Sequence, residues 1–288
     1  MNDTPETPRS LGILAGGGHL PLQVAAAAKA AGRPVFVVGL EGFVDTGWLP
    51  AWPHEIIRMG AAGRIKAALT EHGCRDLVLI GPVRRPSFFD MRPDIECTRI
   101  IARIGRAAFM GDDGLLAAVV KVIGEYGFRV LGAHEILNEA LGPRGLITKA
   151  SPDAAAMADI ARGVAVARAL GAVDVGQGCV VQQGVVLAVE AAEGTDAMLA
   201  RCGPLALRAH GGVLVKIVKP GQDRRIDLPA IGPDTVTAAA AAGLRGIAFE
   251  AAGAILVNRS VTIAAADRAG LFLLGLGADE INHWSRTS

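Results

Sequence analysis

The sequence predicts a two-domain α/β protein, and three observations support this. Short apolar runs alternate with helical patterns along the first half of the chain. Hydrophobic residues make up 51% of the chain but aromatic residues only 4%, and 37 glycines allow close packing of small aliphatic side chains. A length of 288 residues fits two domains better than one small core. Alternating strands and helices are typical of a parallel sheet that is covered on both faces.

The first half repeats one pattern of strand, turn and helix. Residues 11–15 form a short apolar run, a glycine turn follows, and an Ala-rich helix ends at Gly32 before a second apolar run at 35–38. Further strands are predicted at 77–80 and 128–131, each after a helical pattern. This βαβ opening predicts a Rossmann-like parallel-sheet domain over residues 1–133.

The second half changes character after a segment that is rich in glycine and proline. We expect a linker at 134–150, and then a helix that begins with Ser151 as its cap and runs to residue 170. Gln183 and Gly184 separate two apolar runs, which predicts a β-hairpin. A strand at 212–218, helices within 233–243 and 260–270, and a strand at 271–276 complete a C-terminal mixed α/β domain over 151–288.

Charge and cysteine content indicate no particular partner, and the net charge excludes neither nucleic acid nor lipid. A net charge of +1 provides no field for nucleic acid and no polybasic anchor for lipid. The four cysteines are far apart and lack CxxC spacing, so we expect unpaired thiols in a reducing cytoplasm. No uninterrupted apolar run is long enough to span a bilayer, which predicts a soluble protein. The sequence contains no P-loop, GxSxG elbow or HExxH motif.

A glycine turn between the first strand and the first helix is one candidate site. Gly16, Gly17 and Gly18 place backbone amides beside a helix N-terminus, an arrangement that binds phosphate. Pro21 stands where the dinucleotide fingerprint requires its third glycine, so an NAD site is disfavoured. A tight turn without any ligand explains the same residues.

Two further candidates lie beside predicted elements of this half. Arg84 and Arg85 follow the strand at 77–80, at the end where open parallel sheets bind ligands. They either hold an anionic substrate or are ordinary surface arginines. Asp112 and Asp113 directly precede a helix. One acid is expected to cap that helix, and the other is placed to reach a ribose, a substrate hydroxyl or a metal.

Three acids follow the second strand of the predicted hairpin. Glu190 ends that strand, and Glu193 and Asp196 come after it at intervals of three. Thr195 is expected to cap a helix over 196–201, which accounts for Thr195 and Asp196 but not for Glu190. Carboxylate oxygens are the ligands that Mg²⁺ prefers. These acids therefore form either a metal or substrate site or a structural feature.

Residues 216–229, KIVKPGQDRRIDLP, carry charges of both signs just after an apolar run. Lys216 lies within the predicted strand, and because an unpaired buried ammonium is costly, it needs a protein carboxylate or a substrate phosphate. If the segment is extended, Asp223, Arg225 and Asp227 lie on one side. Cations that bind phosphate, beside acids that hold a metal or orient water, suit phosphate transfer. A mutual salt-bridge network is the alternative.

Five motifs, in this order, resemble those of one family: GILAGGGHLP, GDDGLL, DVGQGCVV, LAVEAAEGTDAMLAR and KPGQDRRIDLPAIGPDT. Over residues 10–280 the chain is similar to the UDP-2,3-diacylglucosamine pyrophosphatase family of lipid A biosynthesis, the magnesium-dependent type distinct from calcineurin-like phosphoesterases. The resemblance implies a Rossmann-like domain, a second domain, and a lipid-bearing cleft between them. It also implies hydrolysis of the diphosphate to 2,3-diacylglucosamine 1-phosphate (lipid X) and UMP, with water attacking the sugar-side phosphorus.

The resemblance implies a role for one acid, and the chemistry of the residues described above predicts the roles of the others. The essential aspartate of the family falls at Asp223, with Asp227 as the second choice. The expected Mg²⁺ ligands are Glu190, Glu193, Asp196 and Asp223. The expected substrate-binding residues are Gly16, Gly17, Gly18, Arg84, Arg85, Asp112, Asp113, Thr195, Lys216, Lys219, Gln222 and Arg225.

The implied partner is a lipid-linked nucleotide sugar. A cytoplasmic enzyme would reach it by transient contact with the cytoplasmic face of the inner membrane, and no nucleic acid partner is expected. Two other function classes stay open on the sequence. One is a Rossmann-type NAD(P)-dependent oxidoreductase, and the other is a non-enzymatic protein that binds lipid or nucleotide.

Overall fold

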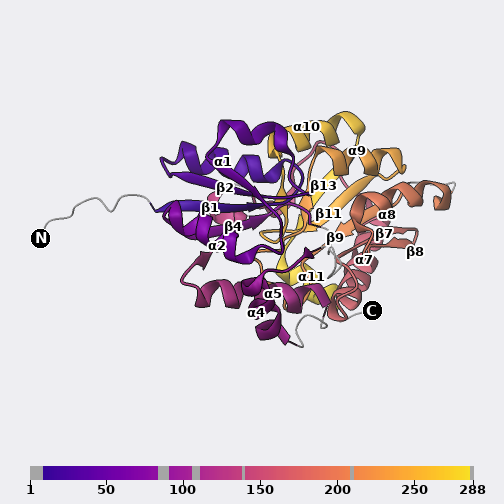
Figure 1. Cartoon of the computed structure of the whole chain (residues 1–288). Coiled ribbons are helices and arrows are strands. Elements are labelled where there is room, and N and C mark those ends of the chain that lie inside the picture. Colours follow the sequence, from indigo (N-terminus) through magenta and orange to yellow (C-terminus); the bar gives the residue numbers. More distant parts are fainter. Residues whose placement is uncertain (1–8, 84–90, 106–110, 138–139, 208–210, 286–288) are drawn as a thin grey trace, which may run out of the picture. The chain divides into compact units, whose positions relative to one another are not determined.

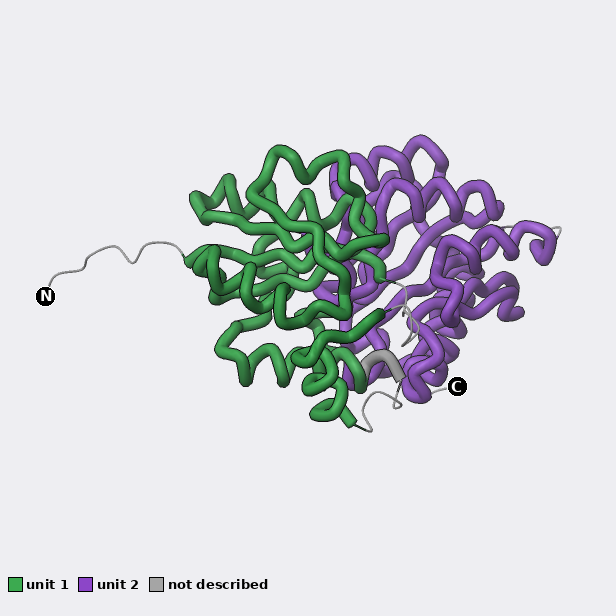
Figure 2. Tube along the Cα trace, in the orientation of Figure 1, with its two compact units in different colours: residues 1–138, 223–226 green, residues 139–222, 227–288 purple. Residues whose placement is uncertain are grey.

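The computed structural model describes residues 9–83, 91–105, 111–137, 140–207 and 211–285. The chain divides into two compact units, shown in different colours in Figure 2. Unit 1 consists of residues 1–138 and 223–226, and unit 2 consists of residues 139–222 and 227–288. Four residues of the charged stretch identified in the sequence, including Asp223, thus belong to unit 1, whereas the segments that flank them belong to unit 2.

Unit 1 is built on a parallel sheet, as predicted. Its described part has five strands in the order β3-β2-β1-β4-β5, which matches the first five positions of a doubly wound Rossmann sheet. Figure 1 labels most of them. The strands are β1 (Ser10–Ala15), β2 (Val35–Leu40), β3 (His54–Ile57), β4 (Cys74–Ile80) and β5 (Arg129–Val130). β3 was not predicted from the sequence, because the edge segment HEII lacks a continuous apolar run.

Helices cover the sheet of unit 1. α2 and α5 pack against the face that carries Phe36, Val38 and Leu77, where Ala68, Leu69 and Ile123 complete the cluster. α1 contacts β1 and β2. The helices are α1 (Leu20–Ala30), the 3-10 turn η1 (Thr46–Ala51), α2 (Ala62–Glu71), α4 (Ile95–Ile104), α5 (Gly111–Glu125) and α6 (Ala133–Ile136).

One buried carboxylate ties three segments of unit 1 together. Asp76 on β4 is 2% exposed. It accepts hydrogen bonds from Arg129 on β5, at 2.8 and 2.9 Å, and from Arg33 in the connection between α1 and β2. Burial by itself raises the pKa of Asp76, but the bonds from the two guanidinium groups outweigh it, so the pKa lies below the usual range.

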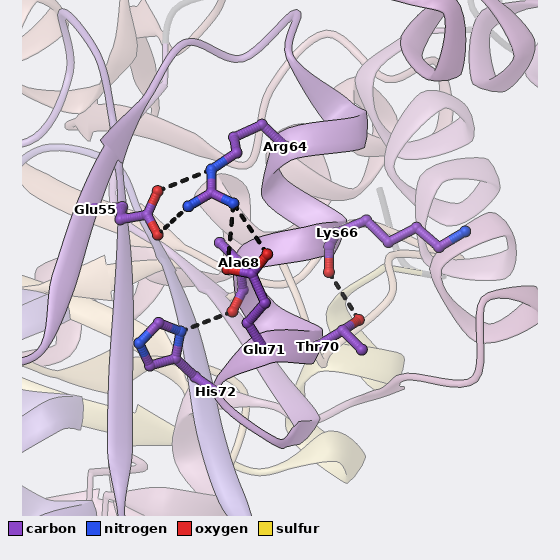
Figure 3. A network of polar contacts seen from close by, with 7 residues as sticks. All are labelled: Glu55, Arg64, Lys66, Ala68, Thr70, Glu71 and His72. Carbon is purple, nitrogen blue, oxygen red and sulfur yellow. Dashed lines mark hydrogen bonds and ion pairs between the residues drawn. The ribbon is translucent and has the colours of Figure 1, made fainter.

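A second polar network lies around α2 and is drawn in Figure 3. Arg64 donates to both oxygens of Glu55 on β3, at 3.0 and 2.5 Å, and to Glu71 at 3.3 Å. His72, at the end of α2, contacts the Ala68 carbonyl at 2.9 Å. The Arg64 side chain is 45% exposed, so these pairs contribute little to stability.

Unit 2 contains a mixed sheet, which confirms the prediction for the second half. Its described part has six strands in the order β6-β13-β11-β9-β7-β8 (Figure 1). β9, β11 and β13 run parallel, and the remaining pairs are antiparallel. The strands are β6 (Gly145–Leu146), β7 (Gly178–Gln182), β8 (Val185–Val189), β9 (Val213–Lys216), β11 (Gly246–Glu250) and β13 (Phe272–Leu276); β10 (Ala230–Ile231) pairs with β12 (Ile255–Leu256) separately.

The predicted hairpin is confirmed. β7 and β8 are antiparallel, and Gln183 and Gly184 between them both have positive φ, +51° and +76°. Two positive values match the twist of a tight hairpin turn. β11 was not predicted, and β6 lies within the segment expected to be a linker.

Helices pack on both faces of the sheet of unit 2. Val213 and Val215 of β9 face a cluster that includes Ile160 and Val164 of α7. Leu214 faces the opposite cluster, which includes residues of α8, α9 and α10. The helices are α7 (Ala154–Ala172), α8 (Gly194–Cys202), the 3-10 turn η3 (Gly203–Leu205), α9 (Pro233–Ala241), α10 (Arg259–Ala269) and α11 (Ala278–Trp284).

The start of α7 differs from the prediction. Its cap is Asp153, whose Oδ1 accepts a hydrogen bond from the Ala156 amide at 2.7 Å, and not Ser151. An aspartate two residues further along offers the same kind of oxygen acceptor.

The four cysteines are buried and unpaired, as predicted. Burial raises the pKa of Cys179 to about 12, so this thiol is not a reactive nucleophile. Over the described residues, no helix combines the length and the apolar character that crossing a membrane requires.

We predict that Asp76→Asn lowers the free energy of unfolding by about 2–3 kcal/mol at pH 7, because it removes the carboxylate that compensates two arginines. Urea unfolding of both proteins measures this difference. Because the folded-state pKa of Asp76 is lowered, its contribution is complete above the usual aspartate pKa and is lost as the pH falls through the folded value. The difference between the two proteins should therefore shrink only in acid. The exposed acid Glu41, changed to Gln, is the matched control, and an equal loss in both variants would contradict the prediction.

Candidate functional site

Lys216 is the last residue of β9, and its side chain is buried. Nζ donates a hydrogen bond to Oγ1 of Thr195 at 2.5 Å and lies 3.6 Å from Oε1 of Glu190. The side chains of Lys216 and Glu190 are only 7% and 8% exposed. Of the two partners that the sequence left open for this ammonium, the structure provides a protein carboxylate.

Glu190 follows β8 and is fixed by both its backbone and its side chain. Its amide donates to the Gly178 carbonyl at 2.8 Å, and Oε1 accepts a hydrogen bond from Thr195 Oγ1 at 2.5 Å. Oε2 is buried and has no hydrogen-bond partner among the described residues. A side chain at Gly178 would place its Cβ 2.9 Å from Oε2, so the glycine makes room for the carboxylate.

Thr195 does not cap the following helix, which corrects the prediction. α8 begins at Gly194, with Glu193 in the cap position. Thr195 therefore lies in the first turn of α8, and its hydroxyl joins Lys216 to Glu190.

Of the acids predicted to share a metal with Glu190, Glu193 and Asp196 do not form a metal-binding group with it, and Asp223 belongs to the other unit. Glu193 accepts a hydrogen bond from Arg201 at 2.7 Å, and this bond holds the pKa of Glu193 below its usual range. Asp196 is exposed. In the part of the chain that the structure describes, no three acid, histidine or cysteine side chains form a group that could hold a metal ion.

A second buried polar group follows β9. Lys219 forms an ion pair with Asp174 at 2.6 Å. Gln222 is 7% exposed; its Oε1 accepts from the Lys219 amide at 2.9 Å, and its Nε2 donates to Asp227 Oδ2 at 2.5 Å and lies 3.4 Å from Gln177 Oε1. Asp174 and Gln177 were not among the predicted site residues. Both residues belong to the DVGQGCVV motif, and this motif could have indicated them from the sequence.

Asp223 lies in a turn, so the condition under which Asp223, Arg225 and Asp227 would lie on one side, an extended segment, is not met. The Ile226 amide donates to the Asp223 carbonyl at 3.1 Å and closes the turn. Arg225 donates to Asp223 Oδ1 from its amide and from Nε, at 3.0 and 2.9 Å, and to Oδ2 from Nη2 at 2.6 Å. The bonds from Arg225, against partial burial, hold the pKa of Asp223 below its usual range.

The glycine turn of unit 1 uses its amides internally. Gly16 donates to the Ile80 carbonyl at 2.9 Å, Gly17 to the Pro82 carbonyl at 3.1 Å, and Gly18 to Oδ2 of Asp45 at 3.0 Å. A Cβ at Gly16 would lie 2.6 Å from the Gly81 carbonyl oxygen. Close packing of the segments that follow β1 and β4 therefore explains why residue 16 is a glycine, without any ligand. The Gly18 amide already donates a hydrogen bond to a carboxylate.

The remaining predicted residues are only partly described. Arg84 and Arg85 lie outside the described residues, and so do the side chains of Asp112 and Asp113. The backbone of both acids belongs to the first turn of α5, which begins at Gly111 and not after them.

The site chemistry is one of paired charges. Lys216, Lys219 and Arg225 each have a carboxylate partner. A lysine ammonium has three hydrogens, so Lys216, which donates one to Thr195, can also donate to an anion. The arrangement can fix cations at set positions and present them to a phosphate group.

The chain is similar to known proteins over most of its length. Family models match in both halves: the LpxI N-terminal domain over residues 10–140 and the LpxI C-terminal domain over residues 143–274. The curated UDP-2,3-diacylglucosamine pyrophosphatase LpxI of Caulobacter vibrioides is 44% identical over 278 residues, which are 94% of this chain and 99% of the relative.

Among solved structures, similarity is low. The GalE-like L-threonine dehydrogenase of Cupriavidus necator, in its holo form, aligns over 96% of this chain and 89% of its own, with 12% identity and a TM-score of 0.32. A partial consensus L-threonine 3-dehydrogenase gives the same score and identity over 96% of this chain and 88% of its own. At this TM-score, neither similarity supports an argument about fold or function.

We predict that Gly16→Ala destabilises the ligand-free protein by about 1–3 kcal/mol, because the added Cβ meets backbone atoms that cannot move aside. Gly47→Ala is the matched control, since nothing lies within 4 Å of a Cβ at that position. Thermal unfolding without ligand measures both variants. If Gly16→Ala kept wild-type stability and lost only phosphate affinity, the packing explanation of this glycine would fail.

Proposed function

The chain belongs to the LpxI family, and from this premise we propose that it hydrolyses the diphosphate of UDP-2,3-diacylglucosamine to 2,3-diacylglucosamine 1-phosphate and UMP. The observation that carries the proposal is the 44% identity to a curated pyrophosphatase over nearly the full length of both chains. Two buried lysines and a half-exposed arginine, each paired with a carboxylate, are consistent with binding and cleaving a diphosphate.

Asp223 is proposed to orient the attacking water. Its low pKa keeps the carboxylate ionised at neutral pH, so it accepts a hydrogen bond from water, and Arg225 fixes its direction. The water oxygen forms a bond to the sugar-side phosphorus while the bond from that phosphorus to the bridging oxygen breaks. UMP leaves with the bridging oxygen, and the protons of the water pass to the two phosphate products or to solvent. Asp227, held by Gln222, is the second candidate for this role.

Lys216 and Lys219 are proposed to bind diphosphate oxygens. Both ammonium groups are largely buried, at 7% and 9% exposure, so their charges are weakly screened by solvent. Thr195 and Gln222, which were expected to contact substrate, instead hold protein groups through the hydrogen bonds described above. We therefore assign both to positioning.

Mg²⁺ is also part of the proposal. Three carboxylates at 190–196 do not fit a metal cage, because Glu193 is bonded to Arg201 and Asp196 points to solvent. Magnesium commonly binds through one or two carboxylates together with substrate phosphates. We therefore propose that Asp223 or Asp227 would supply the protein oxygen for a Mg²⁺ ion that is held mainly by the diphosphate. When bound, it would neutralise phosphate charge.

The lipid substrate implies where the protein works. We propose a cytoplasmic protein that meets its substrate by transient contact with the cytoplasmic face of the inner membrane. Neither alternative function gains a supporting contact in the described residues: the Gly18 amide is bonded to Asp45, and Pro21 interrupts the dinucleotide fingerprint.

We predict that Asp223→Asn lowers the rate of UMP release by about 10³-fold or more while the protein keeps its folded stability, because the amide cannot hold water as a carboxylate does. UMP release from UDP-2,3-diacylglucosamine, followed by chromatography, measures the rate. Asp234→Asn, at an exposed acid in the first turn of α9, is the control and should keep full activity. Turnover of Asp223→Asn within threefold of wild type would exclude Asp223 as the essential acid.

We predict that Arg225→Gln moves the acid limb of the pH–rate profile towards neutral pH. Arg225 is the main cause of the lowered pKa of Asp223, so its removal lets that pKa rise, and the ionised form is lost at a higher pH. The profile of kcat/KM from pH 4 to 9 measures the shift. Arg144→Gln breaks a comparable exposed pair with Asp279 and should leave the limb unchanged. If the acid limb of the profile did not move in Arg225→Gln, the loss of activity in acid could not be assigned to the protonation of Asp223.

A further inference from the structure

We infer that Glu190 is the buried counter-ion of Lys216 and positions its ammonium through the Thr195 hydroxyl, and that Glu190 is not a magnesium ligand. The role of Lys216 towards phosphate rests on the proposed function. The pairing of Glu190 with Lys216 does not, because it follows from contacts within unit 2.

The position of Lys216 in its strand explains why it needs this partner. Side chains alternate along β9, so Lys216 lies on the same face as Leu214, which packs in the cluster that includes α8 and α9. Lys216 is itself 6% exposed, so its ammonium is largely shielded from water on that face. Removing one partner of a buried pair leaves a charge without compensation, which strongly destabilises a protein.

The hydrogen bonds form a chain with one direction. Lys216 Nζ can only donate, so Thr195 Oγ1 accepts from it at 2.5 Å. The single hydroxyl hydrogen of Thr195 then points to Glu190 Oε1, also at 2.5 Å. The Thr195 hydroxyl thus accepts one hydrogen bond and donates one. Two hydrogens of the Lys216 ammonium remain for an anion such as a phosphate oxygen.

The same geometry opposes a metal on Glu190. Oε1 is already shared between a hydroxyl and an ammonium 3.6 Å away. Oε2 is buried without a partner, but Glu190 belongs to no group of three or more acid, histidine or cysteine side chains among the described residues that could hold a metal ion. A divalent cation placed here would lie beside the positive charge of Lys216.

A stability cycle tests the pairing without any activity assay. Glu190→Gln and Lys216→Met each leave one buried charge alone and should lower the melting temperature by on the order of 10 °C. The double variant removes both charges and should recover at least half of that loss. Glu55→Gln breaks the exposed pair with Arg64 (Figure 3) and should shift the melting temperature by no more than about 2 °C.

A kinetic series tests the positioning role. Thr195→Ser keeps the hydroxyl and should retain kcat within about threefold of wild type, whereas Thr195→Val should lose about 10- to 100-fold, as should Glu190→Gln. Because both act through Lys216, the double variant Thr195→Val with Glu190→Gln should lose little more than either alone. The Mg²⁺ concentration for half-maximal activity should change less than threefold in Glu190→Gln.

The outcomes separate this inference from the proposed function. Additive melting losses in the Glu190→Gln, Lys216→Met double variant, full activity of Thr195→Val, or a tenfold higher Mg²⁺ requirement in Glu190→Gln would each overturn it. A wild-type protein that releases no UMP would instead refute the proposed function, and the stability cycle would still decide the pairing.

Discussion

A buried ammonium at the end of β9, that of Lys216, determines how the polar residues Glu190 and Thr195 of unit 2 are arranged. Because the side chain of Lys216 is buried, its ammonium requires an anionic partner. Glu190, at the end of β8, provides that partner. The residue between them, Thr195, belongs to the first turn of α8, so the chain must reverse within the short span from 190 to 195. Gly194, with φ of +80°, lies within that reversal, and Gly178 leaves room for the carboxylate. One charge thus determines how two strands and a helix meet.

Unit 1 is governed by a different constraint, the close approach of two backbones. The turns after β1 and β4 pack so tightly that a Cβ at either Gly16 or Gly81 would collide with backbone atoms of the other turn. Gly81 also has a positive φ of +98°. Carbonyl oxygens and one carboxylate then satisfy the amides of the turn. A glycine-rich turn before a helix is a common phosphate site, yet here the same residues are explained by packing within the sheet.

The fold could be predicted from the sequence because hydrophobic periodicity and turn chemistry are local. Continuous apolar runs identified the strands buried on both faces, and Gln183-Gly184 identified the hairpin. The edge strand β3 lacks such a run and was missed, as was β11, whose apolar run of three residues is short. The two-residue strands β6, β10 and β12 were not predicted either. The choice of ion-pair partners could not be predicted, because it depends on which elements meet in space. Regular spacing suggested that Glu190, Glu193 and Asp196 converge, but Glu190 binds across the sheet while Glu193 turns to Arg201.

The mixture of charges in residues 216–229 follows from the need to hold cations before any anion arrives. Arg225 with Asp223 and Lys219 with Asp174 repeat, on two loops, the pairing of Lys216 with Glu190. Such pairs allow cations to be buried or half-buried in the ligand-free protein at little net charge, consistent with the total of +1. They also fix the donors in place, so under the proposed function a diphosphate would meet oriented N–H groups and need not reorganise them. A carboxylate that stabilises a cation also weakens its attraction for phosphate. An ion that accompanies the substrate would restore the missing positive charge, and for this reason the chemistry of the pairs and the proposal of a substrate-borne Mg²⁺ support each other.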